Sequence, residues 1–152
     1  FDRSHYEDVL VVRVHNLVPS QVWSQRYDEI NAFEKEISDA GTTIVKVAMF
    51  VSLEEQKARL AERLDRPDKY WKYNPGDLDE RALWPAYQEA YQAVLDKTST
   101  DYAPWYVLPA DRKWYARLAV TELLIDALER LDLAWPPADF DVEAEKQRLA
   151  EA

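Results

Sequence analysis

Apolar residues recur at helical spacing in three long stretches of the chain. The clearest stripe ends at Gly41, a residue type that commonly terminates helices, and consists of Tyr27, Ile30, Phe33, Ile37 and Ala40. A second covers about residues 79–97, where Pro85 should interrupt the helix and where we expect Trp84, Tyr87 and Tyr91 in the core. The third follows Asp111, whose carboxylate we expect to cap the helix. The pattern predicts a largely helical frame.

Two shorter segments predict strands. Residues 42–51, TTIVKVAMFV, are β-branched and almost continuously apolar, which is typical of a parallel strand covered on both faces. Residues 105–108 form a second short apolar segment, whereas residues 9–14, VLVVRV, fit a strand or a helix equally well. Because a helix leads directly into the strand at 42–51, we expect an α/β fold in which helices flank a parallel sheet.

A further helix is predicted directly after that strand. Ser52 and Glu55 have capping-box spacing, and the apolar face of the helix would be supplied by Leu53, Leu60 and Leu64. The helix would therefore start at the carboxyl end of a parallel strand. In open α/β sheets this is the edge at which ligands bind.

The chain of 152 residues is long enough for one domain, which we place at residues 1–135, and an acidic tail follows at 136–152. A net charge of −10 argues against general binding of nucleic acid, since that depends on broad cationic surfaces. No apolar run approaches the roughly 20 residues of a membrane span. There is no cysteine, so we expect a soluble, cytoplasmic protein without disulfides.

Positive charge is gathered in one segment, residues 57–72. It carries a net charge of +3, which leaves −13 on the other residues, and its cations are Lys57, Arg59, Arg63, Arg66, Lys69 and Lys72. Arg59 and Arg63 are four apart and share a helical face, and Pro67 ends the helix after them. Such a row suits a multiply charged anion. The alternative is a solvated helix whose cations pair locally with Glu55, Glu62 and Asp68.

Three separated strings carry a family resemblance: FDRSHYED at the start, RLDRPDKYWKYNPGDLDERALW in the middle and TSTDYAPWYVLPADRKW later. From Phe1 to about Leu133 the chain resembles the polyphosphate kinase 2 family, whose members transfer phosphate between inorganic polyphosphate and nucleotides. The resemblance implies a P-loop-kinase fold, a helical lid at about residues 53–97 and a homo-oligomer. Two strings, VLVVRVHNL and ADRKWYARL, are similar to members that act on AMP as well as ADP.

The resemblance also implies residue roles. Asp2 matches the acid of the Walker B segment, which would hold Mg²⁺, and Arg3 would contact phosphate. Arg59 and Arg63 match catalytic cations of the lid, and substrate-binding positions fall on Lys69, Lys72, Arg66, Asp111 and Lys113. Arg66 stands where related sequences commonly have an acid. Cations and Mg²⁺ are what this chemistry requires, because phosphoryl transfer gains most from positioning and from neutralised charge.

One element of the family pattern is missing from these residues. A Walker A loop has the form GxxxxGK, but the chain contains two glycines, Gly41 and Gly76, and no such string. We therefore expect the sequence to start inside a larger protein and to be inactive alone. Two alternatives stay open: a non-catalytic module that binds polyphosphate or nucleotide, and a nucleoside monophosphate kinase that uses ATP.

Overall fold

The computed structural model describes residues 4–152. Within them the chain forms, in order, η1 (His5–Val9), α1 (Val11–Val14), α2 (Ser20–Trp23), α3 (Arg26–Asp39), β1 (Lys46–Phe50), α4 (Leu53–Asp65), η2 (Pro67–Lys72), α5 (Gly76–Ala82), α6 (Trp84–Thr98), β2 (Trp105–Pro109), α7 (Lys113–Arg130) and α8 (Val142–Ala150), where η marks a 3₁₀ helix. None of the helices in this part of the chain is long and apolar enough to cross a membrane.

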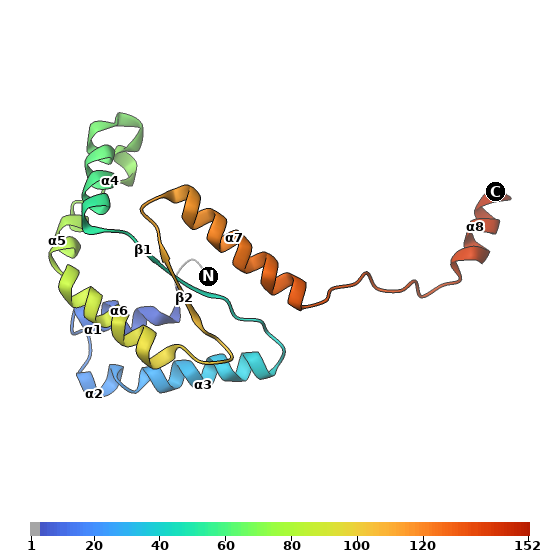
Figure 1. Cartoon of the computed structure of the whole chain (residues 1–152), viewed down its shortest axis with the longest axis horizontal. Helices are drawn as coiled ribbons and strands as arrows, with labels where there is room; N and C mark the ends of the chain where they lie inside the picture. Colours follow the sequence, from blue (N-terminus) through green and yellow to red (C-terminus); the bar gives the residue numbers. More distant parts are fainter. Residues whose placement is uncertain (1–3) are drawn as a thin grey trace.

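The two strands pair in parallel. Lys46 lies opposite Trp105 at one end of the ladder and Phe50 lies opposite Pro109 at the other. The strand pair runs between α7 on one side and α3 and α6 on the other (Figure 1). The predicted α/β class, with a parallel sheet flanked by helices, is confirmed at this level. The strand within residues 42–51 is shorter than its apolar run, because pairing begins at Lys46.

The core lies on the side of α3 and α6. It contains Tyr6 and Val9 from η1, Tyr27 and Ile30 from α3, and Val94 from α6. The predicted stripe of α3 is only partly right, because Phe33 is 46% exposed. Glu34 is buried in its place, four residues after Ile30 and thus on the same helical face.

Local signals set most of the element boundaries. Helix α3 ends just before Gly41, whose φ of +94° lies where a side chain is disfavoured. The predicted interruption near Pro85 is confirmed, since α5 ends at Ala82 and α6 begins at Trp84 with the proline in its first turn. The ambiguous residues 9–14 are helical. After α7 the chain extends away from the body to α8 (Figure 1).

Candidate active site

Helix α4 starts where β1 ends, as the sequence predicts. The Ser52 hydroxyl accepts a hydrogen bond from the Glu55 backbone N–H at 3.1 Å, which is one half of the capping box. Leu60 is buried, but Leu64 is 51% exposed, so its prediction as a core residue is wrong. The reason is geometric: α4 and η2 project from the body, and the end of α4 has no sheet to pack against (Figure 1).

Contacts of Arg59 and Asp111 link the segment that follows β1 to the loop that follows β2. Arg59 Nη2 donates to the backbone carbonyls of Ala110 at 2.8 Å and Asp111 at 3.0 Å, and its Nε donates to Glu55 at 2.8 Å. Asp111 Oδ1 accepts a hydrogen bond from the Ser52 backbone N–H at 2.7 Å. These contacts bring two predicted site residues together at the carboxyl edge of the strand pair.

Asp111 does not cap α7, contrary to the prediction. The residue before the helix is Arg112, which makes no side-chain capping bond, and the carboxylate of Asp111 is held by Ser52 instead. The Ser52 backbone N–H is the main reason that the pKa of Asp111 lies below its usual value of 3.8. The carboxylate therefore stays ionised and links α4 to the loop before α7.

Arg63 lies one helical turn further along α4. Its Nη1 donates to the backbone carbonyl of Lys72 and to Asp77 Oδ2, both at 3.3 Å. The guanidinium thus spans from α4 to the end of η2 and the start of α5. It is partly exposed, and its position is set by contacts from two other elements.

The remaining cations of the segment differ in their partners. Arg66 forms a forked pair with Asp68, with bonds of 3.1 and 2.7 Å, and Lys69 pairs with Glu62. The bond from Lys69 is the main cause of a lowered pKa at Glu62. Lys72 has no carboxylate partner among residues 4–152, and its ammonium lies 4.7 Å from the centre of the Trp71 ring.

Arg59, Arg66 and Lys69 therefore adopt the arrangement of the alternative interpretation, with local pairing to Glu55, Asp68 and Glu62, whereas Arg63 pairs with Asp77 on α5. Lys113, the first residue of α7, also contributes to the lowered pKa of Glu62. Asp2 and Arg3 lie outside the described residues. Within residues 4–152 no three His, Asp or Glu side chains are grouped as metal ligands.

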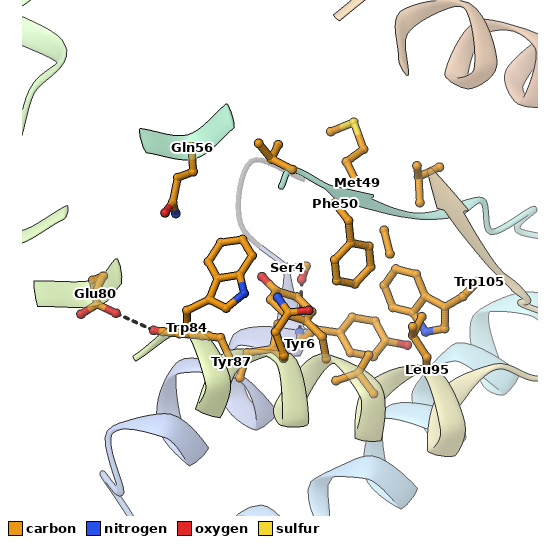
Figure 2. Close-up of a pocket in the computed structure, with 17 residues that line it drawn as sticks. Ser4, Tyr6, Met49, Phe50, Gln56, Glu80, Trp84, Tyr87, Leu95 and Trp105 are labelled. Atoms are coloured by element: carbon orange, nitrogen blue, oxygen red, sulfur yellow. Dashed lines mark hydrogen bonds between the residues drawn. The ribbon is translucent and has the colours of Figure 1, made fainter. Parts of the chain in front are cut away.

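A cavity of 570 Å³ opens between β1 and α6. Phe50, Trp84, Tyr87 and Trp105 face this space, and Ser4 also lines it (Figure 2). Trp84, Tyr87 and Tyr91, predicted as helix core, are only partly buried and line the cavity. The Tyr87 hydroxyl donates to Glu80 at 2.7 Å, which places a polar contact among aromatic and aliphatic side chains.

Sequence reasoning missed a buried ion pair between Glu34 and Lys46, at 2.7 Å. Two signals were present in the sequence. Lys46 is the single charge in the apolar run at residues 42–51, and Glu34 follows Ile30 at core spacing. A charge at such a position needs a partner, since an unpaired buried charge is very costly.

Comparison with known proteins decides the family. The model of the family "Polyphosphate kinase 2 (PPK2)" matches residues 1–134. The chain belongs to the polyphosphate kinase 2 family.

Two similar members show how the match extends. An AMP/ADP-polyphosphate phosphotransferase of Meiothermus ruber is 55% identical over 136 residues, which cover 90% of this chain and 51% of that protein. The crystal structure of polyphosphate kinase 2 from Arthrobacter aurescens TC1 is 55% identical, with a TM-score of 0.97 over 100% of this chain and 54% of that one. The chain thus spans about half the length of these relatives.

The contact between Asp111 and Ser52 predicts a pH dependence of stability. The pKa of Asp111 is lower in the folded state than in the unfolded state. The contact therefore adds to the free energy of unfolding in full above the usual carboxyl pKa, and this contribution is lost as the pH falls through the folded-state pKa. In Asp111→Asn the acid-induced fall in the free energy of unfolding should be shallower than in the wild type, as measured by urea unfolding across the acid range. Asp126→Asn, on the exposed face of α7, is the control. Identical pH profiles for Asp111→Asn and wild type would contradict the assignment.

Proposed function

We propose that the chain carries the lid and part of the phosphate-binding machinery of a polyphosphate-dependent nucleotide kinase. The reaction would transfer phosphate between inorganic polyphosphate and AMP or ADP. The main support is the row of cations on α4 and η2, which starts with Arg59 at the carboxyl edge of a parallel strand pair, in a chain 55% identical to an AMP/ADP-polyphosphate phosphotransferase. The P-loop-kinase fold, a homo-oligomer and a cytoplasmic location belong to the same proposal.

The cations divide by position. Arg59 and Arg63 lie on the ordered helix nearest the strand ends, where planar guanidinium groups would bind the transferred phosphoryl group bidentately. Lys69 and Lys72 lie beyond Pro67 on η2 and would hold the rest of the polyphosphate chain, with Arg66 between the two groups. Asp111 and Lys113 would lie near the nucleotide.

Local pairing does not prevent this role. Exposed ion pairs contribute little to stability, so a polyphosphate can displace the carboxylates from Arg66 and Lys69 at little cost. Each displaced pair is replaced by a charge-assisted bond to a phosphate oxygen. The acids then serve to hold the cations in place before substrate arrives.

Asp2 would hold Mg²⁺, which neutralises phosphate charge in this chemistry. Magnesium is commonly bound by one or two carboxylates together with water and substrate phosphates. A single carboxylate therefore fits the ion, and residues 4–152 need not supply a three-residue cluster.

The first test compares polyphosphate with ATP as the phosphate donor, and residues 1–152 with a longer protein. A protein that joins this chain to a Gly-rich phosphate-binding segment should form ATP from polyphosphate and ADP, whereas residues 1–152 alone should bind polyphosphate weakly without transfer. Nucleotide products are measured with polyphosphate or ATP as donor. Transfer from ATP alone would support a nucleoside monophosphate kinase. Binding without transfer by the longer protein would support a non-catalytic module, and turnover by residues 1–152 would contradict the expected inactivity.

Asp2→Asn should lower kcat by roughly a hundredfold or more in the active enzyme, comparable to the loss of one preorganised electrostatic contact. Steady-state kinetics over a range of Mg²⁺ concentrations measure the effect. Asp8→Asn is the matched control, because Asp8 is an exposed acid of the same segment that pairs with Arg26. Near-normal turnover of Asp2→Asn with unchanged Mg²⁺ dependence would show that Asp2 has no metal-binding role.

Substitutions of the cations should give two kinetic patterns. Arg63→Ala should lower kcat at saturating polyphosphate, since its contacts would strengthen at the transition state. Lys69→Ala and Lys72→Ala should mainly raise KM, more for long chains than for short ones and less at high salt, because remote binding affects KM first.

Steady-state kinetics with short and long polyphosphate at two salt concentrations distinguish these patterns. Lys35→Ala removes an exposed lysine that pairs with Asp39 on α3, and it serves as the control. If the two lysine variants lower kcat as much as Arg63→Ala, without dependence on chain length, all of these cations act at the reacting phosphate.

A further inference from the structure

A fully bonded ion pair lies in the core beside the first sequence motif. Glu34 is 1% exposed and Lys46 is 6% exposed. The Lys46 ammonium donates to Glu34 Oε2 at 2.7 Å, to the Tyr6 hydroxyl at 3.0 Å and to the Thr98 carbonyl at 2.6 Å. All three of its N–H donors are therefore used.

The Tyr6 hydroxyl lies between the two charges. It donates to Glu34 Oε1 at 2.6 Å, and the same oxygen lies 3.2 Å from His5 Nε2. Burial and the bond to Glu34 raise the pKa of Tyr6 far above its usual range, so the hydroxyl keeps its proton as a donor. Within residues 4–152 the one buried side-chain polar atom without a partner is Asn31 Oδ1, so this cluster is completely satisfied.

The cluster joins segments that are far apart in the sequence. Glu34 comes from α3, Lys46 from β1, Thr98 from the end of α6 and Tyr6 from η1. The Trp105 ring at the start of β2 packs edge-on against Tyr6, with ring centres 4.8 Å apart. Helix α6 is the last helix of the predicted lid segment, so one ammonium connects the end of that segment to η1.

Stability alone does not account for such a pair. Removing two charges from water is costly, and apolar residues of the same volume often give equal or greater stability. A satisfied network in a dry core instead fixes the relative positions of its members. The segment that it fixes, η1, begins two residues after Arg3, and Ser4 caps the first turn by accepting a hydrogen bond from the Tyr6 backbone N–H at 3.3 Å.

We propose that Tyr6, Glu34 and Lys46 are positioning residues, which anchor η1 and thereby the chain that carries Asp2 and Arg3. The proposal rests on the phosphotransferase function proposed above. The cluster touches no substrate. It would act by fixing the position of η1, which closely follows Asp2 and Arg3 in the sequence, and by tying η1 to the end of α6.

The test uses Tyr6→Phe in the active enzyme, with Tyr27→Phe as the matched control. Tyr27 is as deeply buried and its hydroxyl also makes a hydrogen bond, with Arg13 at 3.2 Å, but it belongs to α3. Both variants should lower the melting temperature, and Tyr6→Phe should lower it more because the Tyr6 hydroxyl bonds to both buried charges. Tyr6→Phe should in addition lower kcat about tenfold, as seen for partners that orient metal ligands, with KM for polyphosphate nearly unchanged. Hydrogen exchange in residues 4–10 should also speed up in Tyr6→Phe and not in Tyr27→Phe.

Three outcomes would overturn the proposal. These are normal kcat and exchange in Tyr6→Phe, equal loss of kcat in both variants, or a loss confined to KM. If Tyr6→Phe does not fold, the double variant Glu34→Gln with Lys46→Met replaces it, since it removes both charges and keeps the volume. A stable double variant with normal kcat would then reject the positioning role.

Failure of the proposed function gives a different result. If the wild-type enzyme transfers no phosphate from polyphosphate, that function is wrong whatever the variants do. The exchange of residues 4–10 still decides whether the cluster anchors η1, because this measurement needs no turnover.

Discussion

The parallel pairing of β1 with β2 is the constraint from which the candidate site follows. Parallel strands cannot be joined by a tight turn, so the chain that leaves Phe50 must return to the opposite end of the sheet before Trp105. Residues 51–104 make this crossover through α4, η2, α5 and α6. Because both strands end at the same edge, Ser52 and Asp111 meet there and Arg59 reaches the carbonyls beyond β2.

Features with a local physical cause could be predicted from the sequence. Gly41 ends α3 because a glycine tolerates its positive φ, Ser52 starts α4 through its own hydroxyl, and Pro85 allows a helix to start but not to continue. Each of these effects acts within a few residues. The charge pattern singled out the cations of residues 57–72, whereas the roles given to Asp2, Asp111 and Lys113 came from the family resemblance alone.

Features that depend on distant partners were not predictable in this way. Leu64 has the spacing of a core residue, yet α4 projects beyond the sheet that would cover it. Asp111 has the sequence position of a cap, but a backbone N–H from residue 52 competes for the same carboxylate. Glu34 and Lys46 looked like ordinary charges, because the burial of each depends on the other, twelve residues away. The surroundings of these four residues are set by the tertiary fold, so no rule that considers only neighbouring residues could predict them.

The electrostatic contacts of the molecule are of two kinds, and the difference has consequences for a polyanion. In a chain of net charge −10, an approaching polyphosphate is repelled except where cations are gathered. On α4 and η2, Arg66 and Lys69 hold solvent-exposed acids, so in the proposed function a phosphate could replace each acid at little cost, and a long polyphosphate could move from contact to contact. In the core, Lys46 has no donor left for a new acceptor, and exchange would leave Glu34 as a buried, unpaired charge. Exchangeable contacts suit the part of a site along which substrate slides, and a contact that cannot be exchanged suits the part that must hold its place.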